Sequence, residues 1–144
     1  MHVLNVDADV KLLEDVNDFL NEVLVPLNCP ADIQFQIEVA LEEIYSNIAY
    51  YAYPNEIGPT MIYCKVEEEE GKPYLLILEI EDKGIPYNPL DQEDPDITLS
   101  CEEREIGGLG IFLVKNSMDF VSYRHENGAN IFTIKKYLGY ENKE

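Results

Sequence analysis

Residues 75–84 read LLILEIEDKG, an apolar run that ends in an acidic residue and a glycine. Successive side chains of a strand point to opposite faces, so alternate residues from Leu76 to Asp82 are predicted to share one covered face. A carboxylate at the end of a buried row costs free energy unless a donor pairs with it. That donor is a ligand amine, a buried backbone amide or solvent at the strand end, and the residues alone leave these alternatives open.

Two hairpins are predicted around this strand. Residues 60–68 and 73–81 form the first, joined by EEGK, and the second consists of FVSYRHE, an Asn127-Gly128 turn and NIFTIKKYL. An Asn-Gly pair between two apolar runs favours a two-residue turn, because both positions of that turn need a positive φ. Both hairpins imply antiparallel pairing.

Helical periodicity predicts three helices. The first follows a short strand, HVLNV, begins near a cap at Asp7 or Asp9 and ends at Pro26. The second covers roughly residues 32–51, where apolar side chains recur at intervals of three and four. The third is shorter and covers roughly residues 109–117.

Strands in hairpins with helices between them predict the fold class. We expect an α+β two-layer sandwich, in which a mixed, mostly antiparallel sheet carries its helices on one face. A chain of 144 residues fits one domain, and we expect that domain to span residues 1–139, followed by a loose tail at 140–144. The layout is not that of a doubly wound parallel sheet.

The formal net charge of −19 is the unusual total of this composition. A surface this acidic argues against non-specific binding to nucleic acid or to an anionic membrane, because both need a positive surface field. An acidic surface suits a basic protein partner instead.

The cysteines and the apolar runs bear on the compartment. Cys29, Cys64 and Cys101 are odd in number and lack CxxC spacing, so free thiols in a reducing compartment are expected. No apolar run approaches the roughly 18 residues that suggest a membrane span, and the N-terminus lacks a signal-peptide pattern. We therefore expect a cytoplasmic protein without a membrane span.

Two polar residues stand out in the second predicted helix, which contains VALEEIYSNIAYYAY. Glu43 and Asn47 are four residues apart, so they project from the same face one turn from each other. A carboxylate beside an amide can orient a hydroxyl group and hold a hard cation through oxygen. A pair on a solvated helix face has the same spacing, and Glu42 points about 100° away from Glu43.

Glycines precede the third predicted helix in the segment EIGGLGI, residues 105–111. The backbone amides at a helix N-terminus form an anion site, and glycine lets a ligand approach the backbone closely. A plain loop-to-helix turn uses the same residues. The segment is not a Walker A loop, because no Gly-Lys-Ser/Thr is present, and it does not follow a strand as a dinucleotide-binding fingerprint would.

The order of these features is more specific than any one of them. A helix with E-x-x-x-N, a strand ending in D-x-G, a long loop and a G-x-G that opens a helix follow one another. This order resembles the Bergerat ATP-binding fold of the GHKL superfamily, shared by gyrase, heat-shock chaperones, histidine kinases and mismatch-repair ATPases. Within it, EEIYSNIAYYAY, DKGIPYNP and GGLGIFLVKNSMD are most similar to the anti-sigma factor serine/threonine kinases, over roughly residues 3–138.

The resemblance implies a site for ATP and Mg²⁺. Asn47 matches the magnesium ligand of the family, and Glu43 matches its general base. Asp82 matches the acid that accepts a hydrogen bond from the adenine amino group, with Gly84 beside it.

The resemblance also assigns the phosphate-binding turn and the nucleotide lid. The turn that would hold the phosphates consists of Gly107, Gly108, Leu109 and Gly110. The loop before it would be the lid, in which Arg104 is assigned a contact to the γ-phosphate. Two departures weaken the match: some relatives have an Arg directly beside the lid glycines, and many have a His where Tyr51 stands here.

These residues imply an ATP-dependent serine/threonine protein kinase that acts as an anti-sigma-type regulator. Its partner would be an anti-anti-sigma (STAS-domain) protein, with a sigma factor as a further partner. A non-catalytic, ATP-gated binding module is the alternative, and an acidic interaction domain that binds no nucleotide is a third. The outer strand face carries Tyr63, Leu75 and Ile77, which are either a homodimer surface, as in the family, or scattered surface residues.

Overall fold

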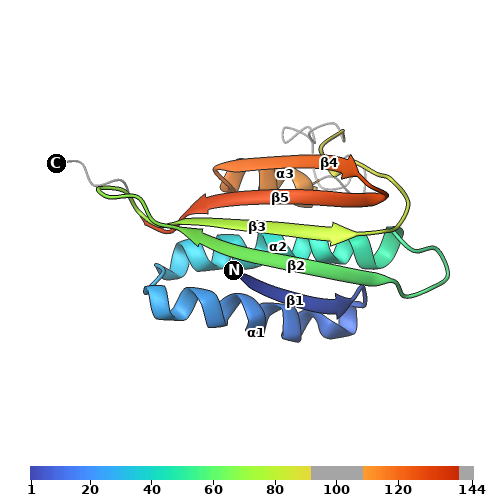
Figure 1. Ribbon diagram of the computed structural model, residues 1–144, viewed down its shortest axis with the longest axis horizontal. Coiled ribbons are helices and arrows are strands. Elements are labelled where there is room, and N and C mark those ends of the chain that lie inside the picture. Colours follow the sequence, from blue (N-terminus) through green and yellow to red (C-terminus); the bar gives the residue numbers. More distant parts are fainter. Residues whose placement is uncertain (92–108, 140–144) are drawn as a thin grey trace, which may run out of the picture.

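The computed structural model describes residues 1–91 and 109–139 as a two-layer α+β fold, with one sheet and its helices on one face (Figure 1). The five-stranded sheet has the order β1-β2-β3-β5-β4, and all its pairings are antiparallel. The strands are β1 (His2–Asp7), β2 (Pro59–Glu67), β3 (Leu75–Asp82), β4 (Phe120–Glu126) and β5 (Ala129–Tyr137). The predicted fold class is confirmed, although the described sheet is antiparallel rather than mixed.

Three α-helices cover the sheet, namely α1 (Leu13–Leu24), α2 (Ala31–Tyr51) and α3 (Leu109–Ser117). The second and third match their predicted ranges. The first is shorter than predicted, because short 3₁₀ turns, Val10–Leu12 and Val25–Leu27, flank it. Asp9 caps the first of these turns by accepting a hydrogen bond from the Lys11 N–H at 3.0 Å. A third 3₁₀ turn, Pro89–Asp91, follows β3.

The hairpins agree with the predicted turns, with one difference in length. Asn127 and Gly128 both have positive φ, 53° and 78°, as a two-residue turn between twisted strands requires. The turn between β2 and β3 is longer than EEGK, because the strands stop at Glu67 and resume at Leu75. The residues between the two strands are polar and exposed for the most part, so they do not extend the buried rows of β2 and β3.

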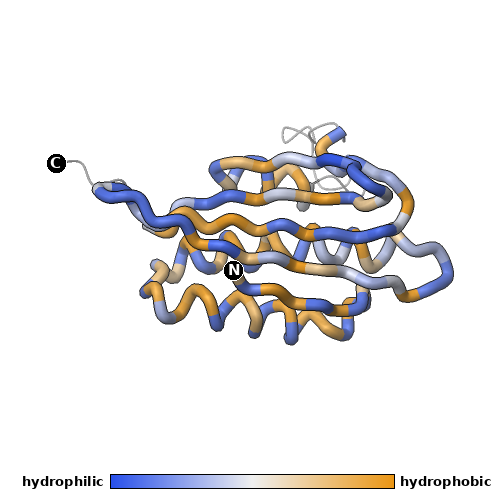
Figure 2. The backbone as a smooth tube through the Cα atoms, viewed as in Figure 1, coloured by the Kyte–Doolittle hydropathy of each residue, from blue (hydrophilic) through white to orange (hydrophobic). Residues whose placement is uncertain are grey.

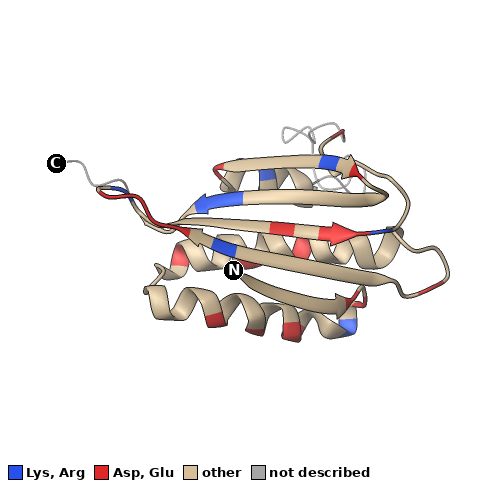
Figure 3. Ribbon diagram, viewed as in Figure 1, with Lys and Arg blue, Asp and Glu red and all other residues tan. Residues whose placement is uncertain are grey.

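The core lies between the sheet and the helices. Alternate residues of the central strands are buried there, including Ile62, Cys64, Leu78, Ile80 and Phe132. Hydrophobic segments accordingly gather on the strands and on the helices behind them (Figure 2). Acidic residues lie along α1 and near the end of β3, while Lys and Arg are few (Figure 3). No helix in the described ranges is long and apolar enough to cross a membrane.

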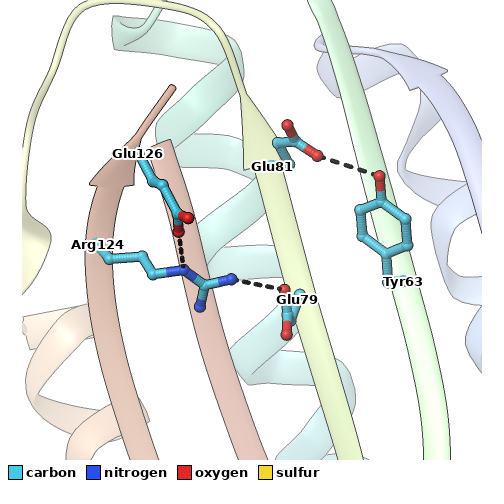
Figure 4. A network of polar contacts seen from close by, with 5 residues as sticks. All are labelled: Tyr63, Glu79, Glu81, Arg124 and Glu126. Carbon is cyan, nitrogen blue, oxygen red and sulfur yellow. Dashed lines mark hydrogen bonds and ion pairs between the residues drawn. The ribbon is translucent and has the colours of Figure 1, made fainter. Parts of the chain in front are cut away.

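None of the helices in the described ranges covers the outer face of the sheet, and polar contacts lie across that face (Figure 4). Arg124 on β4 contacts Glu79 on β3 at 3.4 Å and Glu126 at 3.0 Å. The Tyr63 hydroxyl on β2 donates to Glu81 at 3.1 Å. These pairs are partly exposed, so each contributes little to stability.

Tyr45 joins α2 to the junction between β1 and α1. Its side chain is fully buried, and its hydroxyl donates to the Asp7 carbonyl oxygen at 2.5 Å and accepts from the Asp9 N–H at 3.1 Å. The Asp9 N–H also donates to the Asp7 carbonyl oxygen at 2.9 Å, so the hydroxyl adds a second partner to each of these backbone groups. One side chain therefore fixes where the first strand ends relative to the central helix.

We predict that Tyr45→Phe lowers the free energy of unfolding by about 1–3 kcal/mol, because it removes two buried hydrogen bonds to the backbone, each worth about 0.5–1.5 kcal/mol. Urea denaturation followed by circular dichroism measures the change, and the slope with denaturant should stay the same. Tyr63→Phe is the matched control: its hydroxyl bonds a carboxylate on the outer face, and the loss should stay within about 0.5 kcal/mol. Equal losses in the two variants would contradict this assignment.

Candidate functional site

Three polar side chains lie side by side on the covered face of the sheet, where the remaining row is apolar. Thr60 on β2 pairs with Asp82 on β3, which in turn pairs with Asn130 on β5. Their exposed fractions are 3%, 5% and 5%, respectively. Directly opposite residues of antiparallel strands have Cβ atoms about 4.5–5.5 Å apart. The row is therefore a buried polar patch at the end of the central strand.

Asp82 is held by two donors within the chain. Its Oδ1 accepts from the Gly84 N–H at 2.9 Å and from the Asn130 side-chain amide at 3.0 Å. Among the described residues, its hydrogen bonds fall on Oδ1, which leaves Oδ2 for another donor. A backbone amide, one of the three donors considered from the sequence, thus supplies part of what this carboxylate needs.

The environment of Asp82 opposes its ionisation. Burial raises the pKa of Asp82 above its usual value, and the hydrogen bonds from Asn130 and Gly84 offset part of that rise. The nearby charge of Glu81 adds to the rise, whereas His125 opposes it. A donor that pairs with the ionised carboxylate is favoured at this position.

The turn after Asp82 is pressed against the end of α2. A Cβ added to Gly84 would lie 2.2 Å from the Ala52 carbonyl oxygen, so only glycine fits without a shift of backbone. The Ile85 N–H donates to that same oxygen at 2.9 Å. The Tyr53 hydroxyl accepts from the Lys83 N–H at 2.7 Å, which fixes the turn from its other end.

Asn130 is a site residue that the sequence prediction missed. Its amide nitrogen also lies 3.3 Å from the Gly84 carbonyl oxygen and 3.1 Å from that of Ile85. Its side-chain oxygen accepts from the Tyr123 hydroxyl. The signal was present, because Asn130 alternates with Phe132 in a predicted strand and so is a polar residue in a buried row.

Glu43 and Glu42 have different surroundings. A Cβ added to Gly110, at the start of α3, would lie 2.1 Å from the Glu43 carboxyl group, so that group lies directly against the first turn of α3. Glu42 instead accepts from the Asn17 side-chain amide at 2.6 Å and so faces α1. The two adjacent carboxylates therefore belong to different contacts.

Some of the remaining predicted site residues lie within the described ranges, and others lie outside them. Asn47 is half-buried on α2, one turn beyond Glu43, and Tyr51 is exposed at the end of that helix. Leu109 is the first residue of α3. The predicted contacts of Arg104, Gly107 and Gly108 lie outside the described residues.

The donor set limits how a cation would bind here. The described residues contain no group of three or more His, Cys, Asp or Glu side chains that could hold a metal ion. Mg²⁺ is commonly held by one or two protein oxygens together with phosphate oxygens and water. The Asn47 side chain fits that pattern as a single oxygen ligand.

The site has two ends that are joined by α2. One end is the buried Asp82 with its Gly84 turn against Ala52, and the other is Glu43 against Gly110. Ala52, the C-cap of α2, follows Glu43 by nine positions, a rise of about 13 Å. The arrangement suits an elongated ligand with a hydrogen-bond donor at one end and an anionic group near the N-terminus of α3.

Comparisons with known proteins agree with this geometry. A family model described as "Histidine kinase-like ATPase domain" matches residues 6–136. The serine/threonine-protein kinase BtrW of Bordetella bronchiseptica is 25% identical over 108 residues, which are 74% of this chain and 72% of that protein. The serine-protein kinase RsbW of Bacillus mycoides is 25% identical over 112 residues, 75% of this chain and 66% of that protein.

Solved structures share the fold at low identity. A crystal structure of the RsbU and RsbW domains of Rv1364c from Mycobacterium tuberculosis superposes with a TM-score of 0.64 at 14% identity. The match covers 96% of this chain and 33% of that one. A histidine kinase domain from Erythrobacter litoralis gives a TM-score of 0.52 at 14% identity, over 90% of this chain and 60% of that one.

We predict that Asp82→Asn stabilises the free protein at neutral pH by roughly 3 °C in Tm, because asparagine keeps the acceptor oxygen and removes a buried charge. The sign follows from the raised pKa of Asp82: the cost of ionisation is absent below its usual pKa and fully present above its raised pKa in the folded protein. The difference between variant and wild type should therefore vanish on acidification.

Thermal unfolding across pH measures this difference. Glu81→Gln removes the same formal charge from the adjacent residue on the outer face, so it corrects for the change in net charge. A neutral-pH Tm for Asp82→Asn below that of the wild type would contradict the prediction.

Proposed function

The chain belongs to the histidine kinase-like ATPase domain family, and from that membership we propose that it is an ATP-dependent serine/threonine protein kinase and anti-sigma-type regulator. Its substrate is an anti-anti-sigma (STAS-domain) protein. The contact between the Glu43 carboxyl group and Gly110 carries the proposal, because it puts a general base beside the helix start assigned to the phosphates. The kinase names of the Bordetella and Bacillus relatives support the same reaction class.

ATP fits the two ends of the site in this proposal. The adenine amino group donates to Oδ2 of Asp82, while Oδ1 stays bonded to Gly84 and Asn130. The phosphates lie at the turn formed by Gly107, Gly108, Leu109 and Gly110, with Arg104 on the γ-phosphate. Mg²⁺, when bound through Asn47, would neutralise phosphate charge, which matters in a chain of net charge −19.

The reaction needs one base and a well-positioned acceptor. Glu43 takes the proton from a serine or threonine hydroxyl of the partner as that oxygen forms its bond to the γ-phosphorus. The bond from phosphorus to the β–γ bridging oxygen breaks, and ADP leaves with that oxygen. Positioning and electrostatic stabilisation supply most of the rate enhancement in such transfers.

The remaining parts of the proposal concern partners and location. A sigma factor is a second partner, and the protein acts in the cytoplasm. Homodimerisation would use the outer sheet face, where Tyr63, Leu75 and Ile77 are each half-buried. The sequence has no Arg directly beside the lid glycines, and this departure favours a second candidate function, an ATP-gated binding module that does not transfer phosphate.

We predict that the wild-type protein binds Mg-ATP saturably and that Asp82→Asn weakens binding at least tenfold, about 1.4 kcal/mol. The amide in the variant would present its nitrogen donors or a weaker neutral acceptor to the adenine amino group. Isothermal titration calorimetry gives both affinities. Equal affinities would contradict the assignment of Asp82, and no binding by the wild type would contradict the proposed function.

A second prediction separates Glu43 from its neighbour. Glu43→Gln should lower phosphoryl transfer to the STAS partner by roughly 10²–10⁴-fold, the range for a lost general base, while ATP affinity stays within about threefold. Glu42→Gln is the matched control, because Glu42 bonds Asn17 on α1 and should transfer phosphate at the wild-type rate.

Labelled ATP and the purified partner measure the transfer. Transfer that survives Glu43→Gln would remove the assigned base. A wild-type protein that binds ATP and captures its partner without transfer would establish the binding module instead.

A further inference from the structure

We propose that Asn130 is a positioning residue of the nucleotide site, holding the Asp82 carboxylate and the Gly84–Ile85 turn as one unit for base recognition. This inference rests on the proposed ATP-binding function. It assigns a role to a side chain that does not itself contact the nucleotide. Asn130 lies on β5 and reaches across to β3, so it joins two strands that are far apart in sequence.

Both side-chain amide atoms of Asn130 are hydrogen-bonded within the protein. Its two N–H donors serve three acceptors, at 3.0 Å on Asp82, 3.3 Å on Gly84 and 3.1 Å on Ile85. Its oxygen accepts from Tyr123. With 5% of its surface exposed and its N–H donors engaged by protein acceptors, Asn130 is placed to organise its neighbours rather than to donate to a ligand.

The orientation of the amide is determined by its neighbours. A flipped amide would put its oxygen against three acceptor oxygens and its nitrogen donors against the Tyr123 hydroxyl, so only one orientation satisfies the network. Asparagine is also a poor strand residue, and it would be a weak choice here for packing alone. The network therefore explains why an amide stands in an otherwise apolar row.

The network also reaches the segment that follows β3. The Tyr123 hydroxyl pairs with the backbone of Tyr87 as well as with Asn130. Asn130 thus connects the carboxylate that would accept from adenine to residues 84–87, which lead towards the proposed lid. Displacing the amide should disturb the carboxylate and the turn together.

A variant of the same shape tests this role. Asn130→Asp keeps the acceptor for Tyr123 but replaces the donor beside Asp82 with a second carboxylate. Two carboxylates that share a site hold on to one proton, and the protonated group can again donate to its neighbour. The variant should therefore bind ATP poorly at high pH and recover on acidification.

The other titratable groups around Asp82 are Glu81 on β3, His125 and Tyr123 on β4, and Tyr53 beyond α2. The wild-type protein and the Asn130→Asp variant share these groups. Their titration, and that of the ATP phosphates, therefore cancels in the ratio of wild-type to variant affinity.

Calorimetric titration with Mg-ATP between about pH 5.5 and pH 8.5 measures that ratio. We expect the wild-type protein to bind at least tenfold more tightly than the variant at the highest pH, about 1.4 kcal/mol. This affinity ratio should be at least threefold smaller at the lowest pH. A purely structural role would change the affinity by a factor that does not depend on pH. Thr133→Val is the matched control, because it removes a buried hydroxyl that has no partner within the described part of the chain and lies on the outward side of the same strand. It should bind ATP with wild-type affinity at every pH.

If circular dichroism shows that Asn130→Asp does not fold, Tyr123→Phe is a second variant that tests the same network. It removes the hydroxyl that anchors the Asn130 oxygen, and we expect a loss of about threefold in ATP affinity, within the range of one neutral hydrogen bond. Wild-type affinity in Tyr123→Phe would then overturn the inference.

The remaining outcomes separate this inference from the proposed function. Wild-type affinity in Asn130→Asp, or a loss that is the same at every pH, overturns the role of Asn130 and leaves the ATP site standing. No binding of ATP by the wild-type protein overturns both.

Discussion

The buried carboxylate at the end of β3 constrains the structure around it. Asp82 is 5% exposed. The desolvation free energy of an unpaired carboxylate at that depth would be comparable to the whole free energy of unfolding of a small domain. Its partners must therefore come from close by: a glycine turn that aims an N–H back at it, and an amide from the next strand. This turn also requires glycine at position 84, because the Ala52 carbonyl at the end of α2 leaves no room for a Cβ atom there.

The central helix sets the relative positions of all the other parts. Tyr45 ties α2 to the end of β1, and Ala52 ties it to the turn after β3. The same helix carries Glu43 against the first turn of α3, with Asn47 one turn further along. Because Glu43 and the Ala52 carbonyl oxygen belong to one rigid helix and its C-cap, the distance between the two ends of the site is fixed by helix geometry rather than by loops.

Sequence patterns predicted the parts of this arrangement that depend on local geometry. The alternation in β3 placed Asp82 on the covered face, and the four-residue spacing placed Glu43 and Asn47 together on α2. Contacts between distant segments were beyond reach, since nothing local distinguishes Glu42, which bonds α1, from Glu43, which contacts α3. Asn130 carried the same parity signal as Asp82, but its partner lies 48 residues away and only the register of β3 with β5 reveals it.

The polar row on the covered face divides into a satisfied part and an unsatisfied part. Both amide atoms of Asn130 and one oxygen of Asp82 are hydrogen-bonded within the protein, whereas the Thr60 hydroxyl has no partner among the described residues. The paired groups cost little to keep and make the site rigid. A buried hydroxyl without a hydrogen-bond partner costs free energy, and a hydrogen bond to a ligand or a water molecule recovers that cost. In the proposed site, this network would hold the parts in place, and the Asp82 oxygen that it leaves free would be the acceptor for the nucleotide base.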